Sequence, residues 1–267
     1  MRLAEPAPAK LNLALHVRGK LPDGRHALET LFAFCTDGDR LEAEEAEDLS
    51  LIISGPHSED LSTTDNLVLD AAKVLRDASG VTSGARLFLK KNLPVASGIG
   101  GGSADAAAAL RLLTRLWGID PAHAAAVAPR IGSDVPACLL SMTARGEGAG
   151  DALQLVKDSS IPGTPALLVN PAVPLSTGAV FAAWDGVDRG PLADWRDGRN
   201  DLEAPARSLV PQIGEVLDWL KQQPGAEFVR MSGSGATCFA LFDDEAHWDS
   251  AAESCPSNWW HLASFLR

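Results

Sequence analysis

The stretch from Leu93 to Leu110, LPVASGIGGGSADAAAAL, has the composition of a phosphate-binding loop that opens a helix. Four of the five residues from Gly98 to Gly102 are glycine, so the backbone can adopt positive φ angles and approach a ligand closely. The alanine- and leucine-rich run that follows predicts a helix with Ser103 as its N-cap. Such a loop presents backbone N–H groups and the positive end of a helix dipole, an arrangement suited to phosphate.

Neither of the two common phosphate-binding fingerprints fits this loop. A P-loop requires Lys and then Ser or Thr after its last glycine, whereas Ser103 and Ala104 follow Gly102. The dinucleotide pattern starting at Gly98 would need a third glycine where Ser103 stands. A flexible linker is the alternative, but a predicted strand at 86–91 and the predicted helix bracket the loop closely. Phosphate binding is therefore favoured over a plain connection.

Two charged side chains outside the loop are candidates for group-transfer chemistry. Lys10 lies on the polar face of a strand predicted over residues 5–18, and Asp134 follows a glycine turn at a predicted helix N-cap. Taken alone, Lys10 would be assigned to a solvated strand face and Asp134 to capping. In phosphoryl transfer, a carboxylate can accept the proton of an attacking hydroxyl, while a lysine can hold that hydroxyl and keep the carboxylate ionised.

Alternating and helical patterns of apolar residues predict a mixed chain of strands and helices. A helix is expected over 65–76, the glycines at 144–151 predict a turn, and Pro129 is expected to interrupt the helix that follows 121. Further along, the patterns predict a strand at 166–170, a helix at 209–222 and a strand-loop-strand at 228–242. A Ser-, Pro- and Gly-rich segment near 155–165 suggests a boundary between domains at 1–157 and 158–267.

Composition excludes several classes of protein. The net charge of -12 argues against nucleic-acid binding, because such proteins usually display a basic face. No apolar run is long enough to span a bilayer, and four scattered cysteines form no CxxC pair, so we expect a cytoplasmic protein with reduced thiols. An anionic ligand then needs local compensation from backbone N–H groups, from nearby lysines or from an accompanying Mg²⁺.

Three segments, PAKLNLAL at 8–15, the glycine loop at 93–110 and MSGSGATCFALF at 231–242, together resemble the three motifs of the GHMP small-molecule kinases. With DGRH at 23–26 and IGSDVPACL at 131–139, the chain is similar to the branch of that family that phosphorylates CDP-methylerythritol in the non-mevalonate route to isoprenoids. The resemblance implies an N-terminal α/β domain like domain 2 of ribosomal protein S5 and a C-terminal ferredoxin-like α+β domain.

The resemblance also implies a role for each matching residue. Lys10 and Asp134 take the positions of the catalytic pair, and ATP with Mg²⁺ is the expected cofactor, its direct metal ligands unassigned. The nucleotide is expected along Pro94, Val95, Ala96, Ser97, Gly98, Ile99, Gly100, Gly101, Gly102, Ser103 and Ala104, with Lys91 and Asn66 nearby. The acceptor substrate is expected at Asn12, Arg25, His26, Thr177 and Phe181. A monomer or weak homodimer without membrane or nucleic-acid partners is expected.

One position departs from the family pattern. The family commonly has Tyr before the histidine of this turn, where it stacks on cytosine, whereas this chain has Arg25 and no tyrosine. A guanidinium plane can still stack on a base or pair with a diphosphate. The departure keeps two alternatives open: another GHMP kinase acting on homoserine, mevalonate or a sugar, or a nucleotide-binding protein without catalysis.

Overall fold

The computed structural model describes residues 2–59 and 61–267, which form two compact units. Strands β1 (Leu3–Lys20) and β2 (His26–Ala46) contribute residues to both units. The first unit comprises 1–9, 37–95 and 100–141, and the second comprises 10–36, 96–99 and 142–267. The chain therefore passes between the units several times, and the boundary expected at 157/158 stays a prediction.

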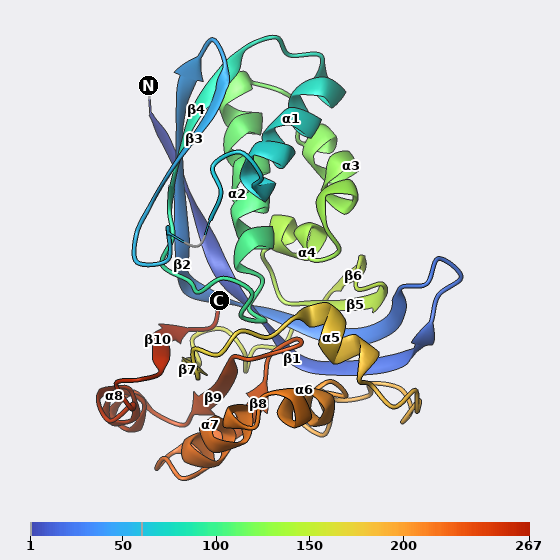
Figure 1. The fold of residues 1–267 in the computed structure, drawn as a ribbon, viewed down its shortest axis with the longest axis vertical. Helices are drawn as coiled ribbons and strands as arrows, with labels where there is room; N and C mark the ends of the chain where they lie inside the picture. Colours follow the sequence, from blue (N-terminus) through green and yellow to red (C-terminus); the bar gives the residue numbers. More distant parts are fainter. Residues whose placement is uncertain (1, 60) are drawn as a thin grey trace. The chain divides into compact units, whose positions relative to one another are not determined.

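The first unit places helices against a short stretch of sheet. Strand β3 (Leu49–Ser54) runs parallel to β4 (Gly84–Lys90), and β4 pairs antiparallel with the end of β2, from Arg40↔Lys90 to Ala46↔Gly84. Figure 1 shows the helices of this unit gathered beside one another: α1 (Leu67–Ser79), α2 (Gly101–Trp117), α3 (Pro121–Ile131) and α4 (Val135–Leu140). Small buried alanines on α2 let the neighbouring helices approach it closely.

Two expectations about helix ends in this unit were wrong. Helix α2 begins at Gly101 with Gly100 as its N-cap, because Gly100 takes the left-handed conformation (φ 67°) that turns the chain into the helix. Ser103 consequently lies inside the first turn. Helix α3 continues through Pro129 to Ile131, since only the last turn follows the proline and little hydrogen bonding is lost.

The second unit is built on a four-stranded antiparallel sheet in the order β10-β7-β9-β8. Its strands are β7 (Pro165–Asn170), β8 (Ala226–Met231), β9 (Cys238–Phe242) and β10 (Trp260–Phe265). Helices α7 (Gln212–Lys221) and α8 (Glu245–Glu253) pack against this sheet, and α5 (Thr177–Ala182) and α6 (Glu203–Leu209) lie between β7 and α7 in the chain (Figure 1). The strand-loop-strand expected at 228–242 is confirmed, with Met231 opposite Cys238 at its tight end.

A hairpin replaces the turn expected at 144–151. Residues Ala144–Gly148 form β5, which pairs with β2, and Ala152–Leu155 form β6, which pairs with β5. The glycines serve close packing here, because a Cβ on Gly146 would lie 2.7 Å from the Phe32 ring. Among the described residues, Cys35, Cys138, Cys238 and Cys255 form no disulfide. Within the described residues, no helix has the length and apolar character needed to cross a membrane.

Candidate active site

The glycine loop is held at its carbonyl groups. In the second unit, the backbone N–H of Lys10 donates to Ile99 O at 2.9 Å, and Thr237 N–H donates to Ser97 O at 3.1 Å. Gly98 has a positive φ of 78°, and a Cβ there would lie 2.5 Å from Gly235 O. Only glycine fits this close backbone approach, and the loop is thereby fixed before any ligand binds.

The start of α2, in the first unit, leaves backbone N–H groups without acceptors in the helix. In a 17-residue helix, the first N–H groups after Gly100 have no carbonyl acceptor within the helix. No acidic side chain lies in the first turn, so the positive end of the helix dipole is not offset there. Gly102 is exposed and has no side chain, whereas Gly101 is buried against Lys91. This geometry agrees with the phosphate binding that the sequence predicts.

The ammonium of Lys10 is held by a buried chain of hydrogen bonds in the second unit. Lys10 Nζ donates to Asn12 Oδ1 at 2.8 Å, and Asn12 Nδ2 donates to Thr30 Oγ1 at 2.7 Å. Thr30 Oγ1 in turn donates to Ala14 O at 2.6 Å, and Lys10 Nζ lies 5.4 Å above the Phe32 ring. Lys10 and Asn12 are both 3% exposed. Asn12, expected as a substrate contact, therefore orients the lysine, and Thr30 is a supporting residue that the sequence pattern did not reveal.

Asp134 occupies the N-cap position of α4, as expected. Its carbonyl accepts the Cys138 N–H at 3.0 Å, and the side chain is half-buried. Pro136 at the second position of the helix stabilises this short turn, because its missing N–H would have no acceptor there. Asp134 belongs to the first unit and Lys10 to the second, and their pairing stays a prediction.

Two aromatic rings gather around His26. The Phe181 ring stacks on His26 at 4.6 Å with 27° between the planes, and the Trp184 ring meets its edge at 5.7 Å and 84°. Burial and, to a lesser degree, Lys20 lower the pKa of His26, which favours a neutral imidazole. Thr177 on the same helix exchanges a 2.9 Å hydrogen bond with Ser234. Trp184 was missed from sequence; its place three residues after Phe181 was the available signal.

Arg25 points its guanidinium at carboxylates. Its Nε lies 2.8 Å from Asp23 Oδ2, and one terminal nitrogen lies 3.4 Å from Asp151 Oδ2. The side chain is 53% exposed, so these pairs contribute little to stability. Arg25 is thus paired with carboxylates, and the aromatic cluster consists of His26, Phe181 and Trp184.

The two residues expected near the nucleotide in the first unit have structural contacts. Asn66 caps α1, with Oδ1 accepting the Val68 N–H at 3.0 Å. The Lys91 ammonium is buried, 2.5 Å from Asp39 Oδ2 and 2.7 Å from Asp105 Oδ2. Whether either residue also contacts nucleotide stays a prediction.

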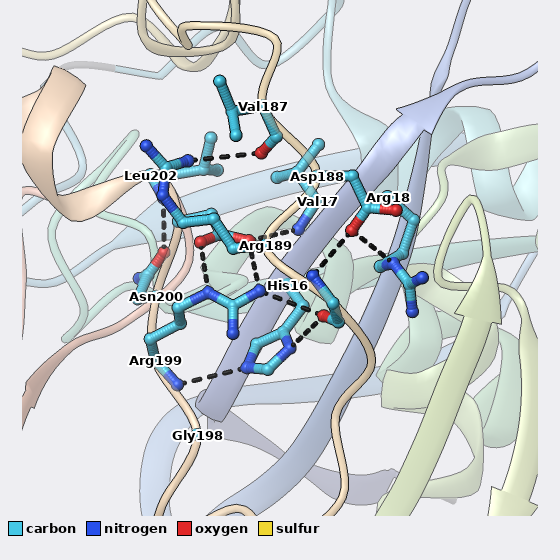
Figure 2. Close-up of polar contacts among 12 residues, drawn as sticks. His16, Val17, Arg18, Val187, Asp188, Arg189, Gly198, Arg199, Asn200 and Leu202 are labelled. Carbon is cyan, nitrogen blue, oxygen red and sulfur yellow. Dashed lines mark hydrogen bonds and ion pairs between the residues drawn. The ribbon is translucent and has the colours of Figure 1, made fainter.

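A histidine at the far end of β1 fastens the chain between α5 and α6 (Figure 2). The backbone N–H of Arg199 donates to His16 Nε2 at 3.2 Å, so Nδ1 carries the proton and donates to Gly190 O at 3.1 Å. Burial chiefly lowers the pKa of His16, which matches this neutral form. The Asp201 carboxylate accepts the Val17 N–H at 2.8 Å and the Arg199 Nε–H at 2.6 Å. These bonds tie β1, the strand of Lys10, to a loop that lies 174 to 184 residues away in the sequence.

A pocket of about 380 Å³ in the second unit is lined in part by Arg199 and Asp201. Its two arginines are ion-paired, Arg189 with Asp185 and Arg199 with Asp201, so the pocket presents no net charge to a ligand.

Among the described residues, Asp243, Asp244 and His247 form a group close enough together to hold a metal ion. These side chains are exposed and pair with one another at the start of α8.

Comparison with known proteins relates this chain to a family of small-molecule kinases. The family model "GHMP kinases N terminal domain" matches 66–142, and "GHMP kinases C terminal" matches 187–260. Relatives include the 4-diphosphocytidyl-2-C-methyl-D-erythritol kinase of Rhizorhabdus wittichii, which is 50% identical over 100% of this chain and 96% of the relative. The corresponding kinase of Novosphingobium aromaticivorans is 50% identical over 100% of this chain and 94% of the relative.

Solved structures agree with the sequence relatives. The crystal structure of a 4-(cytidine 5'-diphospho)-2C-methyl-D-erythritol kinase superposes with a TM-score of 0.81 at 34% identity, over 100% of this chain and 99% of that one. A homoserine kinase from Cytophaga hutchinsonii reaches a TM-score of 0.72 at 17% identity over 99% and 95%, a likeness of fold alone. The two-domain architecture expected from the motifs is confirmed. The chain therefore belongs to the GHMP kinases and, within them, to the 4-diphosphocytidyl-2-C-methyl-D-erythritol kinase family.

Proposed function

We propose that this protein transfers the γ-phosphoryl group of ATP to the 2-hydroxyl of 4-diphosphocytidyl-2-C-methyl-D-erythritol, a step of non-mevalonate isoprenoid synthesis. The observation that carries the proposal is the glycine loop, fixed through its carbonyls and leading into the uncapped positive end of α2. Full-length identity of 50% to kinases of that name supports the acceptor.

The nucleotide half of the site neutralises charge. The N–H groups of the loop and of the first turn of α2 bind the phosphates of ATP and the charge that develops on them during transfer. The chain carries a net charge of -12, so the triphosphate is best delivered with Mg²⁺. When bound, that ion withdraws charge from the phosphate oxygens. The protein residues that would ligate it stay unassigned.

The acceptor half moves one proton. Asp134 accepts the proton of the 2-hydroxyl as its oxygen attacks phosphorus. Lys10, aimed by Asn12, holds the hydroxyl oxygen for attack. Because Lys10 N–H also donates to Ile99 O, the same strand that aims the ammonium fixes the glycine loop. Positioning of the two reactants then supplies much of the rate.

The cytosine base is bound at the aromatic cluster. Neutral His26 offers one ring N–H and one acceptor nitrogen to the edge of a base, and Phe181 offers a face for stacking. The Phe181 ring rests on His26, and the Trp184 ring meets the edge of His26.

The assay is direct. Purified protein with ATP, Mg²⁺ and the cytidine substrate should form ADP and the 2-phosphate, and a panel with homoserine, mevalonate and a sugar should show little turnover. Asp134→Asn keeps the shape of the side chain and should lower kcat by about 10³-fold or more while KM for ATP stays near wild type. Preferred turnover of another acceptor would replace the substrate assignment. Near-normal kcat in Asp134→Asn would remove this residue as the base.

The location and assembly of the protein form part of the same proposal. A cytoplasmic monomer or weak homodimer suits a kinase of soluble intermediates. Cell fractionation and sedimentation at several concentrations test these two statements separately.

A further inference from the structure

One ammonium joins three segments of the first unit. Lys91, which follows β4, contacts Asp39 on β2 and Asp105 in α2 at 2.5 and 2.7 Å. None of these three side chains is more than 4% exposed. A buried charge persists in a protein only when it is paired in this way, so the position of α2 is coupled to both strands through Lys91.

The triad of Lys91, Asp39 and Asp105 lies against the backbone on both sides of the glycine loop. A Cβ on Gly101, the first residue of α2, would lie 3.0 Å from Lys91 Nζ. Asp39 Oδ1 accepts the N–H groups of Asn92 at 2.5 Å and Leu93 at 2.9 Å, immediately before the loop. The chain entering the loop is thus bonded to Asp39, and the helix leaving the loop is bonded to Lys91 through Asp105.

Lys91 keeps its positive charge and directs it at Asp39 and Asp105. Burial lowers the pKa of Lys91, but the facing Asp105 and Asp39 carboxyls raise it by more, so the side chain remains an ammonium. Burial also raises the pKa of Asp105 to about 8, and its Oδ1 has no hydrogen-bond partner among the described residues. Two of the three N–H donors of the Lys91 ammonium are used by these carboxyl groups, and the side chain is only 2% exposed, so little of it is accessible to a phosphate.

We propose that the Lys91 side chain is a positioning residue that acts through Asp39 and Asp105 to hold the first turn of α2 in its phosphate-binding place. The proposal rests on the proposed function, in which that turn binds the phosphates of ATP. It assigns the triad a role in nucleotide affinity that is separate from acceptor binding and from proton transfer.

A double-mutant cycle tests the proposal. Lys91→Met, Asp105→Ala and the double variant are compared by calorimetric titration with ATP–Mg²⁺, and by kcat and the two KM values. The effects of residues that act as one unit do not add. Each single variant should therefore weaken ATP binding about 10-fold, and the double variant should bind ATP no more weakly than the single variant with the lower affinity. KM for the acceptor should stay near wild type. Asp105→Asn, which keeps an acceptor oxygen for Lys91, should restore binding to within about threefold of wild type.

The outcomes separate the alternatives. Weaker binding in Lys91→Met with unchanged binding in Asp105→Ala would show a direct contact between Lys91 and nucleotide and would overturn the proposal, as would unchanged binding in both. If Lys91→Met fails to fold, the contrast between Asp105→Ala and Asp105→Asn decides, and equal ATP affinity in those two contradicts the proposal. Wild-type protein that binds ATP–Mg²⁺ without phosphorylating the cytidine substrate would refute the proposed function and leave this test intact.

Discussion

Replacing Asn12 with alanine tests how Lys10, the proposed catalytic lysine, is aimed. Asn12 Oδ1 accepts a 2.8 Å hydrogen bond from the buried Lys10 ammonium, and its own Nδ2 is anchored to Thr30. A hydrogen bond to a charged group contributes about 1.5–3 kcal/mol. If the ammonium is misaimed in the transition state by that amount, kcat falls about 10- to 150-fold, since each 1.36 kcal/mol is a factor of ten.

Steady-state kinetics with saturating ATP and acceptor measures this loss. KM for ATP should change little, because the phosphate-binding amides do not contact Asn12. The matched control is Thr30→Val, which removes the partner of Nδ2 and leaves Oδ1 on Lys10. It should cost about 1–3 kcal/mol of stability through unpaired buried polar groups, yet keep kcat within about threefold of wild type.

The reasoning fails if folded Asn12→Ala turns over at the wild-type rate, because the ammonium would then be aimed by other groups. It also fails if Thr30→Val loses as much kcat as Asn12→Ala, since the effect would then follow general loosening of β1.

Two further predictions concern stability. The Arg230 guanidinium donates to three backbone carbonyls, and burial lowers its pKa to about 10. Replacing it in Arg230→Met should lower the free energy of unfolding by about 3–5 kcal/mol, because these carbonyls lose their donor. A decrease below about 1 kcal/mol, measured by urea unfolding, would contradict this prediction. Burial is the main cause that raises the pKa of the Asp105 carboxyl to about 8. The folded protein therefore keeps a proton on this carboxyl that the unfolded chain releases at about pH 4. The free energy of unfolding that this proton contributes is complete below about pH 4 and is lost as the pH rises through about 8. Urea unfolding between pH 4 and 9 should show a flatter dependence in Asp105→Asn, and an unchanged slope would contradict the assignment.

Local chemistry made several features readable from the sequence. Glycine spacing predicted the loop before α2, apolar periodicity predicted α1, α7 and the β8–β9 hairpin, and three short motifs pointed to the GHMP kinases. These features depend on backbone freedom and on which face of an element is apolar, and both are encoded within a few neighbouring residues.

Tertiary structure decided what long-range partners each side chain meets. Lys91 has the sequence context of a nucleotide contact, but Asp39 and Asp105, 52 and 14 residues away, draw its ammonium inward. Similarly, Trp184 joins His26 only because α5 and the residues that follow it pack against the start of β2. A buried polar group takes whichever partner the fold places within reach, since leaving it unpaired costs more than any local preference. Sequence thus determined the loop and the family, and the packing of distant segments determined which residues aim the lysine and hold the helix.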